Sequence, residues 1–277
     1  MNTTTDPAAN TTTDPAVSTT TDPGGLRLDP GLAVHLLRLG DDALVLGQRL
    51  CQWITRAPSI EEDLALSNIA LDLIGQARVL LTRAGGLDGT GRDEDALAYA
   101  RTDREFTNAL LTELPNGDFA ATVARQLAYT HYAVAYYEAL GGCPDPELAA
   151  FGQRAAKEVA FHRLHADTWT ERLGLGTPES TRRMQRGLDL VWPYTAELFD
   201  EDDVVRALAA AGTIPSPAPL RPLWERSTTE VITRAGLTVP TPAWQARGGR
   251  TGLHTEEFAS LVAELQSVNR QFPGGTW

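Results

Sequence analysis

The sequence has only two cysteines, Cys51 and Cys143, among its 277 residues. Two cysteines cannot build the several disulfides of a small secreted domain or a zinc site made mainly of thiolates. The sequence also lacks an uncharged apolar run of about 18 residues, which a membrane-spanning helix needs, and a basic start followed by an apolar stretch, as in a secretory signal. These absences predict a reduced, cytoplasmic protein with no membrane partner.

Basic residues are scarce relative to acidic ones. The 24 basic side chains, of which only Lys157 is a lysine, stand against 36 acidic ones, which gives a net charge of −12 at pH 7. Nucleic acid and anionic membrane surfaces repel such a chain, so neither is an expected partner. The hydrophobic content of 42% is nevertheless sufficient for a folded core.

Several motifs that carry chemistry are missing too. We find no Walker A sequence, no GxGxxG after a strand, no GxSxG and no CxxC. A helical protein of this size can instead hold two metal ions between its helices, which requires Glu-x-x-His on each of two helices. No histidine here has a glutamate three positions before it. The residues therefore do not predict a metal centre of that kind.

The first 23 residues form a low-complexity segment. The sequence TTTDP occurs at 3–7, 11–15 and 19–23, with a period of eight residues. This stretch has almost nothing apolar to bury, and each Asp-Pro step disfavours a helix. We therefore expect a disordered tail over residues 1–25, followed by one helical domain over residues 26–277.

Beyond the tail, apolar residues recur at three- and four-residue spacing, which is typical of helices. Strand-like alternation is scarce, so the expected fold class is all-α: a bundle of long helices with short satellite helices. Long helices are expected over about 32–57, 59–84, 118–140, 146–173 and 179–211, the last kinked at Pro193. Shorter ones are expected within 93–114, 221–235 and 255–270.

The helix expected over 59–84 is apolar on nearly every side, which is typical of a helix in the middle of a bundle. Gly85-Gly86 is expected to end it. Asn68, Asp72 and Gln76 follow one another along it at four-residue spacing. This polar line fits either a narrow solvent-facing stripe or an internal network that faces the bundle axis.

A second polar group lies on the helix expected over 146–173. Glu158 and His162 are four residues apart and can share a helix face, and His165 follows one turn later. Because His162 lies on an otherwise apolar stripe, we interpret it as a buried histidine that hydrogen-bonds to Glu158 or another neighbour. A metal ligand is the alternative, but too few partner ligands are in view.

Six segments of the chain carry a resemblance to a known family. They are LRLGDDALVLGQRL, APSIEEDLALSNIALDLIGQAR, LPNGDFAATVARQ, KEVAFH, GLHTEEFASLVAELQ and the final PGGTW. Together they resemble the structural, non-catalytic C subunit of bacterial phenylacetyl-CoA 1,2-epoxidases, over roughly residues 32–277. The resemblance implies a ferritin-like helical bundle.

The resemblance also implies that a metal site has been lost. The catalytic sister subunit binds iron through two Glu-x-x-His pairs, which fall here on Leu73 with Gln76 and on Val159 with His162. Leucine and valine donate nothing to a cation. This chain is therefore expected to bind no metal or other cofactor and to supply no catalytic residue.

One further ligand position is suggested by the same comparison. Asp42 falls in the region of a first-helix ligand of the sister subunit. With Asn68, Asp72 and Glu158 it is a candidate for an internal polar network.

The resemblance implies a scaffold that pairs with the di-iron catalytic subunit of a multicomponent monooxygenase in aerobic phenylacetate degradation. In such complexes O2 is used to epoxidise the ring of phenylacetyl-CoA, and a reductase subunit with FAD and an iron–sulfur cluster supplies electrons from NADPH. Two other hypotheses stay open: a metal-dependent ferritin-like oxygenase acting in its own right, and an unrelated helical interaction protein.

Overall fold

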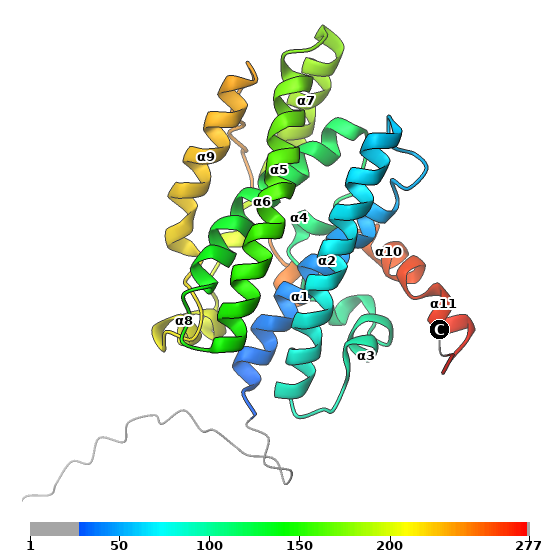
Figure 1. Cartoon of the computed structure of the whole chain (residues 1–277), viewed down its shortest axis with the longest axis vertical. Coiled ribbons are helices and arrows are strands. Elements are labelled where there is room, and N and C mark those ends of the chain that lie inside the picture. Colours follow the sequence, from blue (N-terminus) through cyan, green and yellow to red (C-terminus); the bar gives the residue numbers. More distant parts are fainter. Residues whose placement is uncertain (1–27, 276–277) are drawn as a thin grey trace, which may run out of the picture.

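The computed structural model describes residues 28–275, so the predicted repeat tail lies outside the described residues. Helices dominate this range, and it contains no strand. Four long helices form two antiparallel pairs: α1 (Pro30–Cys51) packs along α2 (Ile60–Leu87), and α5 (Phe119–Leu140) packs along α6 (Pro146–Gly174) (Figure 1). The arrangement confirms the expected all-α, ferritin-like bundle.

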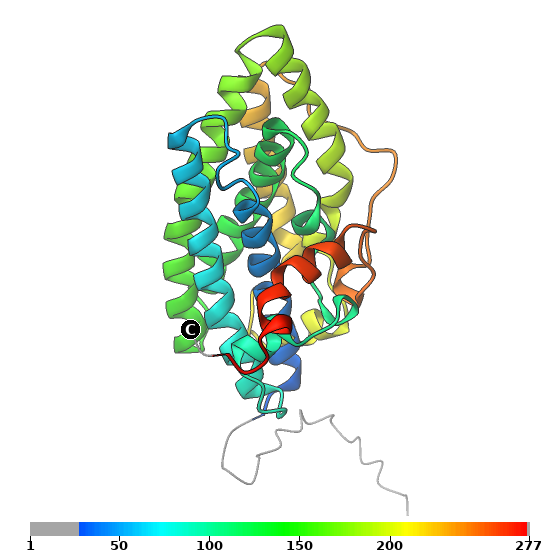
Figure 2. The ribbon, with the colours of Figure 1, turned by 90° about the vertical axis from the view of Figure 1, so that its right-hand side faces the viewer.

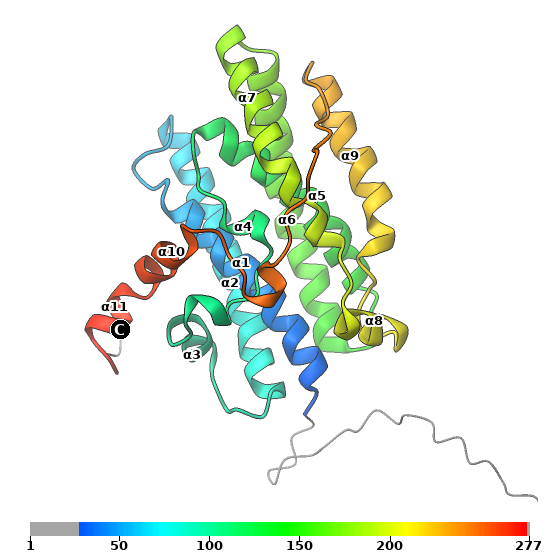
Figure 3. The same cartoon turned by 180° about the vertical axis from the view of Figure 1, so that it is seen from behind.

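Shorter helices cover the back and the ends of these two pairs (Figure 3). They are α3 (Glu94–Tyr99), α4 (Leu110–Glu113), α7 (Pro178–Val191), α8 (Asp203–Ala210), α9 (Arg221–Arg234), α10 (Phe258–Leu265) and α11 (Ser267–Gln271), with 3-10 turns η1 (Asp103–Glu105), η2 (Trp192–Tyr194), η3 (Ala196–Phe199), η4 (Ala218–Leu220) and η5 (Gly249–Thr251). Between α9 and α10 the chain crosses the back of the bundle over α1 (Figure 3). In Figure 2, by contrast, α2 and α6 run side by side along one edge, with no other described helix outside them.

Local sequence signals set the ends of the long helices. Ser59 caps α2 by accepting a hydrogen bond from the backbone N–H of Glu62 at 3.3 Å. Asp118 caps α5 in the same way, and Asp145 caps α6 with Pro146 in the first turn. The predicted bounds of α5 and α6 are therefore confirmed to within one residue.

Three predictions about helix ends are wrong. The helix expected over 32–57 ends at Cys51, and residues 52–59 form turns and bends before α2. Gly85-Gly86 does not end α2, which continues through both glycines. A Cβ at Gly85 would stand 1.9 Å from the carbonyl oxygen of Arg92, so this glycine permits the following loop to approach closely. The helix expected over 179–211 is broken rather than kinked, because Pro193 cannot donate to the preceding turn and the chain continues through η2 and η3.

The expectation that α2 lies in the middle of the bundle is also wrong. One side of α2 packs on α1, but Leu64 and Leu71 are 61% and 65% exposed. Among the described helices α2 alone is long and apolar enough to cross a membrane, yet 44% of that apolar window is buried, and core helices of soluble proteins meet the same criterion. The central helix is instead α5, most of whose side chains are buried.

Candidate functional site

Leu73 and Val159 lie in the interior of the bundle. They are 1% and 0% exposed, and they project inward from α2 and α6 respectively. Neither side chain has a donor atom, so neither can hold a cation. In this position each stabilises the bundle through the apolar surface that it removes from water.

Gln76 and Glu158 join α2 to α6. The Nε2 of Gln76 donates to Oε2 of Glu158 at 2.9 Å. The Oε1 of Gln76 is buried and has no hydrogen-bond partner. The amide is therefore turned so that its donor meets the carboxylate, which can only accept.

His162 forms the next link between these helices. Its Nε2 lies 2.9 Å from Oδ2 of Asp72, so its partner is on α2 rather than at Glu158 on its own helix. Burial lowers the pKa of His162, and Asp72 offsets that effect only in part. The imidazole is neutral at pH 7, and its Nε2–H donates to Asp72. A further pair, His165 with Glu62 at 2.7 Å, joins the same two helices.

The other two polar residues singled out from the sequence lie elsewhere. Asn68 is exposed. Asp42 is buried in α1, where it accepts hydrogen bonds from the Arg250 guanidinium at 2.7 and 3.0 Å and from the backbone N–H of Ala109 at 2.7 Å. Burial raises the pKa of Asp42, and the positive charge of Arg250 opposes that effect. These polar residues therefore do not converge on one point.

The donor set between α2 and α6 does not fit a di-iron pair. At the two expected ligand pairs only the amide of Gln76 and the imidazole of His162 could donate to a metal, and each is already hydrogen-bonded to a carboxylate. A di-iron centre in a helical bundle needs several carboxylates aimed at one point. Within residues 28–275, no group of three or more His, Cys, Asp or Glu side chains is arranged to hold a metal ion.

A buried ionic network, which no sequence pattern predicted, fastens loops to α1. Adjacent Asp41 and Asp42 are both almost fully buried. Asp41 pairs with Arg101 at 3.0 Å and accepts from the backbone N–H of Thr107 at 2.8 Å, while Asp42 pairs with Arg250. The available signal was two consecutive acidic residues inside an apolar helix, a costly placement unless each carboxylate is paired.

His254 extends the buried ionic network to the C-terminal segment. Its Nδ1 lies 2.6 Å from a carboxylate oxygen of Glu113, and its Nε2 lies 2.9 Å from the carbonyl oxygen of Phe106. Both partners are acceptors, so both ring nitrogens must carry protons and the imidazole is charged. Burial lowers the pKa of His254, but the Glu113 carboxylate outweighs that effect and the pKa is raised.

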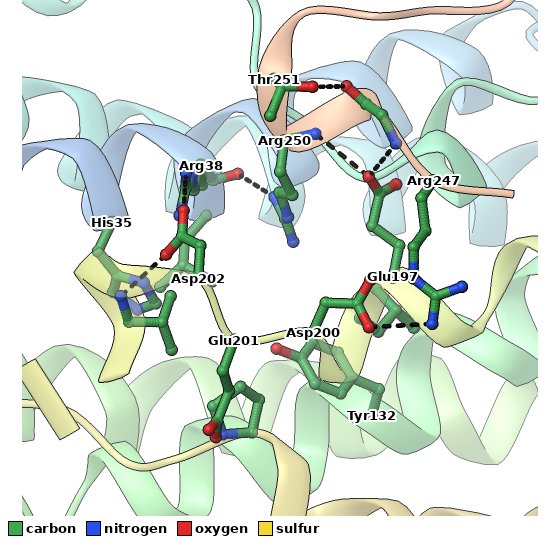
Figure 4. A pocket seen from close by; sticks show the side chains of 15 residues that line it. His35, Arg38, Tyr132, Glu197, Asp200, Glu201, Asp202, Arg247, Arg250 and Thr251 are labelled. Carbon is green, nitrogen blue, oxygen red and sulfur yellow. Dashed lines mark hydrogen bonds and ion pairs between the residues drawn. The ribbon is translucent and has the colours of Figure 1, made fainter. Parts of the chain in front are cut away.

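A cavity of about 470 Å³ lies beside this network (Figure 4). Glu197 on its wall accepts hydrogen bonds from the backbone N–H groups of Leu110 and Gly248, both at 2.8 Å. His35 hydrogen-bonds to the Tyr136 hydroxyl at 2.6 Å, and burial, with a smaller effect of the nearby arginines, lowers its pKa to about 3. Three guanidinium groups of the wall are each paired with a carboxylate: Arg38 with Asp202, Arg247 with Asp200 and Arg250 with Asp42.

The fold and the donor set define the class: an all-α, ferritin-like bundle whose expected ligand positions do not fit a di-iron pair. The model of the family described as "Phenylacetic acid catabolic protein" matches residues 22–277. The chain is 46% identical over 246 residues to the C subunit of the 1,2-phenylacetyl-CoA epoxidase of Escherichia coli (strain K12), a match that covers 89% of this chain and 99% of that relative. The chain therefore belongs to the phenylacetic acid catabolic protein family, and the resemblance predicted from its motifs is confirmed.

Proposed function

We propose that this chain is the non-catalytic scaffold subunit of a phenylacetyl-CoA epoxidase. It pairs with the di-iron catalytic subunit and stabilises that subunit's helical bundle during phenylacetate degradation. The observation that carries the proposal is the burial of Leu73 and Val159, which stand where the resemblance implies two glutamate ligands in the catalytic sister subunit. The similarity to the C subunit of an epoxidase, over nearly the whole length of that relative, supports the same role.

In this proposal the chemistry belongs to the other subunits. The catalytic subunit holds the iron, and a reductase subunit with FAD and an iron–sulfur cluster supplies the electrons. This cytoplasmic chain binds no cofactor of its own and has neither nucleic acid nor membrane as a partner. Its contribution is a surface of fixed shape.

The packing between α2 and α6 suits a chain that must keep its shape without a metal. In a bundle that binds iron, the ligand carboxylates repel one another when the cation is absent. Here apolar side chains stand at two of those positions, and Gln76 and His162 are tied to carboxylates across the two helices. The bundle is therefore stable without the charge of an ion.

Co-expression with the catalytic subunit tests the proposal. We expect the two chains to co-elute in size-exclusion chromatography and the iron to remain with the catalytic subunit when they are separated. The isolated chain, loaded aerobically with ferrous iron, should retain well under one iron per chain. Epoxide formation from phenylacetyl-CoA, with the reductase present, should require the catalytic subunit. A stoichiometric iron pair in this chain, or turnover by this chain alone, would contradict the proposal.

A further inference from the structure

Helices α2 and α6 form the edge of the bundle that no other described helix covers (Figure 2), and several large apolar side chains of these two helices are exposed. We name this surface the α2/α6 face. Their spacing of three, seven and ten residues places them on one side of each helix. The face is made by Leu64, Leu71 and Ile74 on α2 and by Phe161 and Leu164 on α6, which are 39–74% exposed.

Gly75 lies in the same exposed stretch of α2. A Cβ at this position would meet no atom of the chain within 4 Å, whereas a Cβ at Gly40 would stand 2.7 Å from a Leu81 methyl group. A glycine inside a helix destabilises it relative to alanine. Packing within the chain therefore requires the glycine at Gly40 but not at Gly75. A glycine would be required at position 75 if the backbone of another molecule approached α2 closely at that point.

The α2/α6 face has the size of one side of a stable interface. The two helices contain 28 and 29 residues, so each is roughly 42 Å long at 1.5 Å per residue. Two adjacent helices, each about 10 Å wide, present about 800 Å². That area is about what each partner contributes to a typical specific protein–protein interface.

The similarity to one subunit of a multi-subunit epoxidase favours a different subunit, rather than a second copy, as the occupant. The exposed charged side chains of the two helices are of both signs: Glu61, Asp72 and Arg78 on α2, and Glu147, Arg154, Lys157 and Arg172 on α6. Arg154 is paired with Glu158, and Arg78 with Glu94. The exposed apolar side chains, rather than charge of one sign, therefore define the face.

We propose that the catalytic subunit docks on the α2/α6 face. Its docking surface is a pair of long helices with an apolar stripe, and one of those helices crosses close to Gly75. This inference rests on the proposed function and assigns it to one surface of the chain.

Substitutions on this face should affect the isolated chain and the complex in different ways. Gly75→Gln adds a good helix former where the chain has space, so the melting temperature of the isolated chain should stay the same or rise by about 1–3 °C. The added side chain blocks close approach, so the dissociation constant for the catalytic subunit should rise at least about tenfold. Leu164→Ala should weaken binding in the same direction, and Leu190→Ala is its matched control, an exposed leucine on α7 outside the face.

Titration calorimetry of each variant against the catalytic subunit separates the outcomes. Wild-type binding that both Gly75→Gln and Leu164→Ala leave unchanged would overturn the inference while the proposed function stands. Failure of the wild-type chain to bind would instead defeat the proposed function. Self-association of the wild-type chain that Gly75→Gln abolishes would show that a second copy occupies the face, which also overturns the inference.

Discussion

Leu73 is a buried packing residue at the position that the family resemblance aligns with a glutamate ligand of the catalytic sister subunit. A glutamate there would place a charge in the interior of the bundle, which is costly without a cation or a donor nearby. The leucine is 1% exposed and fills that place with apolar surface. A leucine at this position therefore suits a chain that binds no metal better than a glutamate would.

The neighbouring residue Leu71 offers a matched control for the contribution of Leu73. Leu73→Ala should lower the free energy of unfolding by about 2–5 kcal/mol, through lost transfer energy and the cavity left behind. Leu71→Ala, on the exposed side of the same helix, should change it by less than about 0.5 kcal/mol. Urea denaturation of the isolated chain measures both values. Equal losses for the two variants would contradict the burial that separates them.

His254 should make the stability of the chain depend on pH. Its pKa in the folded state is raised above the ordinary 6.5. The stabilisation from its ion pair with Glu113 is therefore fully present below about pH 6.5 and is lost as the pH rises through the folded-state pKa. The free energy of unfolding should fall as the pH rises above about 6.5, and by more in the wild type than in His254→Gln. The same fall in both proteins would show that another group is responsible.

At the scale of secondary structure, α2 shows where the predictive value of the sequence ends. Capping residues and prolines defined α5 and α6 well, because these signals act within one or two turns. The burial of α2 was mispredicted because a helix that is apolar on every side does not reveal which side faces the core. The two consecutive acidic residues in α1 were a local sign of the buried ionic network, but its partners were not predictable from local pattern, since Asp42 and Arg250 are 208 residues apart.

Gly85 and Gly86 are adjacent in α2, but alanine substitutions at the two positions should change the free energy of unfolding in opposite directions. A Cβ at Gly85 would clash with the Arg92 carbonyl oxygen, so Gly85→Ala should lower the free energy of unfolding by about 1–3 kcal/mol. A Cβ at Gly86 would meet nothing within 4 Å, and Gly86→Ala should raise it by about 0.5–1 kcal/mol. Chemical denaturation of the two variants and the wild type measures both changes. A gain in stability from Gly85→Ala would mean that the loop after α2 is not held against the helix.

At the scale of the whole molecule, the buried ionic network joins parts of the chain that lie far apart in sequence. Asp41 and Asp42 of α1 bind segments that precede α4 and the segment that crosses the back of the bundle. Each carboxylate meets both a guanidinium and a backbone N–H, so its charge is compensated on two sides. The long helices and the irregular segments are thus held as one unit.

Replacing one cationic side chain of this network should lower the free energy of unfolding far more than replacing a nearby cationic side chain at the surface. Arg250→Met leaves Asp42 buried without its counter-ion and should cost about 3–5 kcal/mol. Arg247→Met removes a partly exposed partner of Asp200 and should cost less than about 1 kcal/mol. Adding Asp42→Asn to Arg250→Met should recover part of the loss, as measured by a double-mutant cycle in denaturant. Additive losses would mean that the two residues do not act as a pair.

The α2/α6 face is exposed to solvent whenever this chain is without a partner. Exposed apolar surface of that extent favours aggregation and marks a chain as incomplete for chaperones and proteases. A chain made in excess of its partner would then be removed, while a paired chain would persist. If the proposed pairing holds, the same two helices would keep the numbers of the two subunits matched without a regulatory site.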